Sequence, residues 1–93
     1  MAITDQNRRE SLDKLDRKRM YGLIITALHN KEKGLTAREA AIILYNQGMI
    51  ISNERQATQP RLTELVDKGV VKVIGKRKDE ITNRNVAVYA LNN

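Results

Sequence analysis

The chain contains no cysteine, and this absence excludes a disulfide framework and any metal site built on thiolates. His29 is the only histidine, so histidine-rich metal chemistry is excluded as well. Neither Phe nor Trp occurs, and Tyr occurs three times. This scarcity argues against the aromatic stacking platforms of single-strand and RNA-binding modules. We therefore expect no metal, no cofactor and no enzymatic activity.

Long apolar runs are missing too. No stretch is long enough to span a bilayer, and residues 1–10 are polar where a secretory signal needs an apolar core. We expect a cytoplasmic protein with no membrane partner. The 93 residues suffice for one domain with a single modest core. The organisation we expect is a flexible segment at residues 1–10 followed by one domain at 11–93.

Positive charge is what the chain has in excess. Its 17 Lys and Arg outnumber its 11 Asp and Glu, which gives a formal charge of +6 and a pI near 9.9. Such a balance fits a polyanionic partner, although many basic domains bind none. The positive charge is spread over both halves of the chain and gathers only locally, at residues 8–9, 17–19 and 76–78.

A helical period of apolar residues begins after Ser11 and predicts a first helix that ends in the segment 30–34. Its clearest positions, at i, i+3, i+4, i+7 and i+8, are Met20, Leu23, Ile24, Ala27 and Leu28. The front half, residues 13–19, is mostly charged. We expect that half to extend beyond the core, either as a solvated extension or as a surface for a second copy of the chain.

Thr36 and Glu39 predict a second helix that starts at Ala37. The Thr hydroxyl can accept from the amide at position 39 while the Glu carboxylate reaches back to the amide of Thr36. Gly48 should end this helix, and we expect the isoleucine side chains of the connection 49–52 to enter the core. The side chains predicted to form the buried side are Ala40, Ala41, Ile43, Leu44 and Tyr45.

The third helix lies within residues 53–69 and has one apolar edge. Thr58, Leu62, Leu65 and Val66 share that edge, so Arg55, Gln56, Gln59 and Thr63 point elsewhere. Pro60 leaves two alternatives open. A helix that starts at Glu54 is kinked by the proline, whereas a later start at Thr58 places it in the first turn, where no amide donor is needed. The choice decides whether Arg55 and Gln56 lie on the helix or before it.

After Gly69, residues 70–74 and 86–91 read as two antiparallel strands, because they are rich in valine and bounded by turn formers. The segment 75–85 between them is charged and contains Gly and Asn. The prediction is a hairpin with a long, basic tip.

The order of these elements resembles that of small winged helix-turn-helix proteins of bacteria and their phages. The residues that carry the resemblance lie at 35–40, 58–65, 68–71, 75–78 and 82–89. The resemblance covers roughly residues 12–91. It implies a mainly α fold with a small β-hairpin, in which three helices carry a basic wing.

The resemblance also implies roles for individual side chains. The third helix would enter the major groove, and the wing would lie on the backbone or in the adjacent minor groove. Arg55, Gln56, Gln59 and Thr63 are assigned to base edges or nearby phosphates, Arg61 to a phosphate, and Lys76, Arg77, Lys78 and Arg84 to the wing. Arg61 could instead pair with Glu64 or with an acidic residue of the first helix. Residues 76–78 could instead form a loop that is only solvated.

Two functions follow as expectations. The first is binding of double-stranded DNA in transcriptional regulation or phage-genome control, as a monomer or a homodimer. The second is a protein–protein interaction module that uses the same fold without binding DNA. Salt dependence separates them, because duplex binding weakens steeply as salt rises.

Overall fold

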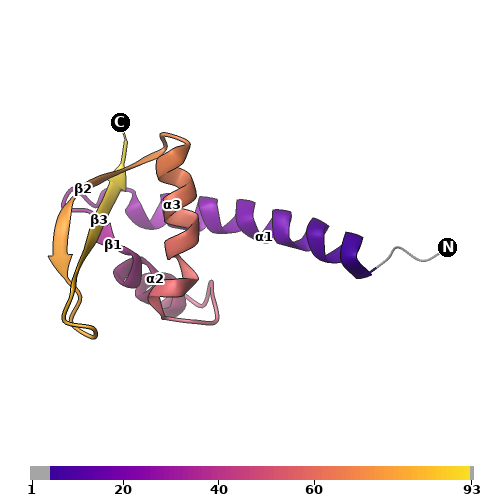
Figure 1. Cartoon of the computed structure of the whole chain (residues 1–93), viewed down its shortest axis with the longest axis horizontal. Helices are drawn as coiled ribbons and strands as arrows, with labels where there is room; N and C mark the ends of the chain where they lie inside the picture. The colour runs from indigo at the N-terminus through magenta and orange to yellow at the C-terminus, as the bar shows by residue number, and fades with distance from the viewer. Residues whose placement is uncertain (1–4, 93) are drawn as a thin grey trace.

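The computed structural model describes residues 5–92, with side chains from residue 16 onward. It contains three α-helices and a small antiparallel sheet of three strands in the order β1-β3-β2 (Figure 1). This layout is compatible with the predicted winged arrangement. The elements are α1 (Asp5–Leu28), β1 (Leu35–Thr36), α2 (Ala37–Asn46), the 3-10 turn η1 (Arg55–Ala57), α3 (Gln59–Asp67), β2 (Val71–Lys78) and β3 (Asn85–Leu91).

The first helix is longer than the sequence pattern predicts. It begins at Asp5 rather than Ser11, so the boundary expected after residue 10 falls inside α1. Residues 1–4, the rest of the segment expected to be flexible, lie outside the described residues. The C-terminal half packs Ile24 and Leu28 into the core, while the N-terminal half extends away from the body of the protein (Figure 1).

The core lies where α1, α2 and α3 meet the sheet. Its largest fully buried side chains are Ile24, Leu44, Leu62, Leu65, Val71 and Thr58. Tyr45, predicted to be buried, is 45% exposed because it lies about 100° around α2 from Leu44. In the connection before η1 only Ile50 packs against the core, whereas Ile51 is fully exposed, so the expectation for this segment holds for one isoleucine and fails for the other.

The start of α2 confirms the predicted capping box. The Thr36 hydroxyl accepts from the Glu39 amide at 3.1 Å, and the Glu39 carboxylate accepts from the Thr36 amide at 2.8 Å. Thr36 also belongs to β1, a two-residue strand that the sequence pattern does not predict. Gly34 allows this pairing: it has φ +73°, and a Cβ there would lie 2.6 Å from the Tyr89 carbonyl oxygen.

Of the two alternatives for the third helix, the structure has the late start. Pro60 lies in the first turn of α3 and produces no kink, and Arg55 and Gln56 belong to the separate turn η1. Thr58 precedes α3 but caps it with no side-chain hydrogen bond. Its buried hydroxyl instead donates to the Ala37 carbonyl at 2.5 Å, and this hydrogen bond links the start of α3 to the start of α2.

The hairpin strand β2 extends four residues beyond the predicted end at Ile74. It pairs with β3 as far as Lys78 and Asn85. The basic residues 76–78, predicted in the hairpin tip, therefore lie on a strand. The hairpin loop is the shorter segment 79–84.

Candidate nucleic-acid interface

Gln59 and Thr63 lie on the exposed side of the first half of α3. Gln59 is half-buried, and its Nε2 donates to the Tyr89 hydroxyl at 2.7 Å. Thr63 is exposed and donates to the Gln59 carbonyl at 3.1 Å. The sheet thus holds Gln59 in one orientation at the edge of the surface.

Arg61 has the pairing that the sequence left open as an alternative. Its guanidinium contacts the Glu64 carboxylate at 2.6 Å, and only 24% of its side chain is exposed. Glu64 also accepts from the Tyr21 hydroxyl and lies 3.6 Å from Arg17. The Tyr21 hydrogen bond, helped by Arg61 and Arg17, lowers the pKa of Glu64, and the same bond raises the pKa of Tyr21. Arg61 therefore belongs to a polar network that joins α1 to α3.

A β-bulge decides which way the basic residues of β2 face. Val73 pairs with Tyr89, but Gly75 pairs with Val88, so Ile74 is the extra residue. Because alternate residues face opposite sides of a sheet, this shift moves Lys76 and Lys78 to the face of Val73 and Tyr89. That face is the one where Tyr89 meets Gln59 of α3. Both lysines are exposed there.

Arg77 lies on the opposite face of β2 from Lys76 and Lys78. Its guanidinium pairs with the Glu39 carboxylate of the α2 capping box and donates to the Lys33 carbonyl at 3.1 Å. The three basic residues predicted to act together are thus divided. Two face the α3 side of the sheet, and one joins the hairpin to the start of α2.

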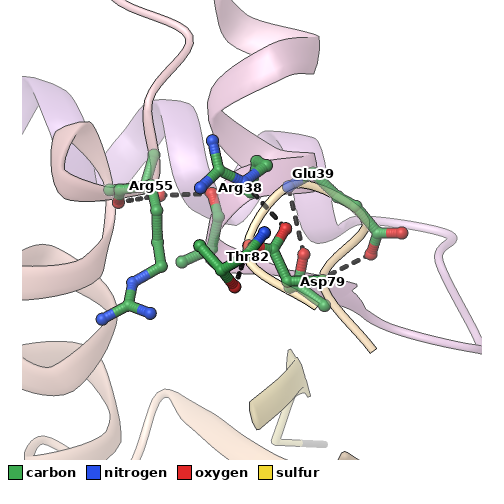
Figure 2. A network of polar contacts seen from close by, with 8 residues as sticks. Arg38, Glu39, Arg55, Asp79 and Thr82 are labelled. Carbon is green, nitrogen blue, oxygen red and sulfur yellow. Dashed lines mark hydrogen bonds and ion pairs between the residues drawn. The ribbon is translucent and has the colours of Figure 1, made fainter. Parts of the chain in front are cut away.

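Asp79 organises the hairpin loop, a role that the sequence analysis missed. Its carboxylate is buried, pairs with Arg38 at 2.8 Å and accepts from the Thr82 hydroxyl at 2.8 Å and the Thr82 amide at 3.3 Å (Figure 2). The Thr82 hydroxyl and Arg38 lower the pKa of Asp79. The spacing of Asp79 and Thr82 is a local turn signal that the sequence contains, but nothing in the sequence indicates the partner Arg38, 41 positions away.

Arg55 and Gln56, both exposed on η1, line a groove between η1 and the hairpin loop. The other lining residues are Arg38, Glu54, Ile81 and Thr82. The Arg55 guanidinium points away from the Arg38–Asp79 pair (Figure 2). Arg84, also exposed, lies at the end of the hairpin loop, where its carbonyl accepts from the Asp79 amide at 2.8 Å. The groove brings the residues predicted before α3 next to the hairpin.

No family model, curated protein or solved structure matches the chain. Within residues 5–92, no helix is both long and apolar enough to cross a membrane. Among the side chains that the structure describes, from residue 16 to residue 92, no three or more His, Cys, Asp or Glu are placed to bind a metal ion together.

Proposed function

We propose that the chain binds double-stranded DNA as a winged helix-turn-helix protein, with α3 in the major groove and the hairpin on the backbone or in the minor groove. One observation carries the proposal. Four exposed cations have no ion-pair partner among the described side chains and lie on η1, which directly precedes α3, and on the hairpin: Arg55, Lys76, Lys78 and Arg84.

These cations suit a phosphate backbone because they are not neutralised within the protein. Phosphate contacts position a protein on the duplex, and contacts to base edges give it sequence preference. Gln59 and Thr63 lie on the exposed side of α3, and the amide of Gln59 fits an adenine edge. Arg61 and Arg77 are engaged in ion pairs, so we place them in a supporting role. The biological setting that we propose is transcriptional regulation or phage-genome control.

Salt dependence of duplex binding tests the proposal. If the four cations each neutralise one phosphate, the logarithm of affinity should fall with the logarithm of salt concentration with a slope of about −3.6. Raising salt from about 50 to about 200 mM would then weaken binding roughly 100-fold. The measurement is fluorescence anisotropy of a labelled duplex across a salt series.

A double substitution assigns this effect to the hairpin. The variant Lys76→Ala/Lys78→Ala should reduce the slope by about 2 for every duplex sequence. The matched control Lys31→Ala/Lys72→Ala removes the same charge from exposed residues that line a different groove, behind the sheet. It should leave the slope unchanged. Equal slopes for both variants and the unmodified chain would exclude Lys76 and Lys78 from the interface.

A protein-interaction module is the second candidate. The observation that favours it is that three apolar side chains on α2 and just beyond it are exposed, those of Ile42, Tyr45 and Met49. Retention on a protein partner, together with no binding to duplex DNA at low salt, would select this function over the first.

A further inference from the structure

Ile81 is a large aliphatic residue at the outer end of the hairpin, and 70% of its surface is exposed. It lies in a loop whose other residues are polar or charged. Burial of an isoleucine side chain stabilises a protein because it removes apolar surface from water, so the fold gains little from placing this one in water. A partner that covers Ile81 would gain that contribution instead.

The loop that carries Ile81 is held firmly. Besides the Asp79 carboxylate contacts to Arg38 and Thr82, the Asp79 carbonyl accepts from the Asn83 amide at 2.7 Å. The Asp79 amide donates to the Arg84 carbonyl at 2.8 Å and closes the loop. Asn83 has φ +64°, a left-handed conformation that asparagine tolerates well. These bonds fix the backbone on both sides of Ile81, so its side chain is presented in a defined position.

The position of Ile81 agrees with the surface proposed to meet DNA. Ile81 lines the groove that also contains Arg55 and Gln56, just before α3. A second groove contains Ile81 and Lys78, together with the acidic Glu80. The apolar side chain therefore shares one groove with an exposed cation of η1 and another with an exposed cation of β2.

We propose that Ile81 is an apolar wedge that enters the minor groove and bends the bound duplex; this inference rests on the proposed DNA binding. Minor-groove proteins insert Ile, Leu, Phe, Met or Pro between base steps and kink the duplex by roughly 20–90°. Such a wedge needs an apolar side chain, a rigid support and neighbouring cations that hold the backbone. The hairpin loop has all three. Pyrimidine–purine steps unstack most easily, so the wedge should favour TA or CA/TG steps.

The test measures bending separately from binding. The probe is a duplex of about 30 base pairs, chosen by selection on the protein from random DNA and labelled at both ends for energy transfer. The unmodified chain should raise end-to-end transfer by the amount that a kink of this kind produces. Ile81→Ser, added at a concentration that saturates the duplex, should leave transfer at the value of the free duplex. Ile81→Leu should restore the bend.

Ile51→Ser is the matched control, because Ile51 is equally apolar and fully exposed but lies in the connection before η1. It should leave both affinity and bending unchanged. A straight duplex in the complex, or the same bend with Ile81→Ser, overturns the wedge while DNA binding stands. If selection recovers no duplex and the chain binds none at low salt, both the wedge and the proposed function fail.

Discussion

Three arginines and two lysines around the hairpin behave differently. Arg38 and Arg77 each pair with a carboxylate of another element, and Arg61 pairs within α3. Lys76 and Lys78 make no ion pair with any described side chain. The planar guanidinium suits fixed contacts with carboxylates, whereas the ammonium group is a flexible point charge. The count of 17 Lys and Arg therefore overstates the number of cations that are free to meet a ligand, because some of them are paired with carboxylates of the same chain.

The three arginine pairs also differ from one another in burial. In the Arg38–Asp79 pair the side chains are 15% and 3% exposed, whereas those of Arg77 and Glu39 are 37% and 39% exposed. Buried ion pairs depend strongly on both partners, because removal of one leaves an uncompensated charge. Exposed pairs contribute little. The comparison predicts that substitutions at Asp79 affect stability most.

The largest effect is expected for Asp79→Asn. The substitution leaves Arg38 without its charge partner and weakens the bonds to Thr82, so the melting temperature at pH 7 should fall by several degrees. Circular dichroism measures it. Glu80→Gln, at the exposed neighbouring acid, is the matched control and should change the melting temperature little.

The same variant has a distinct pH dependence. The pKa of Asp79 is lower in the folded chain than in the unfolded one. Its carboxylate therefore stabilises the fold fully above about pH 4, the unfolded value, and this contribution disappears as pH falls through the lower folded value. The difference in melting temperature between the unmodified chain and Asp79→Asn should shrink below about pH 4. A difference that stays constant from pH 7 to pH 2 would contradict the assigned role of Asp79.

Substitutions of Arg77 and of its neighbour Lys78 should have smaller effects, and these effects should differ from each other. Arg77→Ala removes a half-exposed pair with Glu39, so it should lower the free energy of unfolding by no more than about 1 kcal/mol and change duplex affinity less than threefold. Lys78→Ala removes the same charge from the opposite face of β2. It should leave stability unchanged and reduce the salt slope of duplex binding by about 0.9. If Arg77→Ala weakens binding as much as Lys78→Ala does, the Arg77–Glu39 pair must open on DNA.

The features that the sequence predicts well are those formed by residues close together in the chain. The capping box of Thr36 and Glu39 and the i, i+3 pairing of Arg61 with Glu64 depend on residues within one helical turn, so spacing alone identifies them. The sequence leaves the place of Pro60 open between two alternatives. The start of α3 depends partly on a tertiary hydrogen bond, from Thr58 to Ala37, which spacing does not reveal.

What the sequence does not predict is set by contacts between distant residues. Residues 75–78 contain glycine and three cations, which is a loop composition, yet they pair with β3 and extend the strand. The bulge at Ile74 reverses the facing of the lysines, and no spacing rule places it. Leu35 and Thr36 become a strand only because β3 lies beside them. The composition of these residues therefore predicts a basic hairpin. Which of their side chains share a face of the sheet follows only from the register of the strands.

A further effect concerns Gln59, the one side chain predicted to read bases that is also held by the sheet. Tyr89→Phe removes the hydroxyl that accepts from Gln59 and leaves the ring in the core. Loss of one hydrogen bond of this kind should lower the free energy of unfolding by about 0.5–1.5 kcal/mol.

The effect of Tyr89→Phe on DNA recognition is more informative than its effect on stability. An unrestrained Gln59 must be ordered on binding, and ordering one flexible side chain typically costs about 0.5–1.5 kcal/mol. The discrimination between the preferred base pair and its alternatives should therefore fall between about twofold and tenfold, measured by competition between duplexes that differ at one position. Gln59→Ala should abolish this discrimination. If Gln59→Ala changes sequence preference and Tyr89→Phe does not, Gln59 reads bases without help from the sheet; if neither does, its bond to Tyr89 serves only the fold.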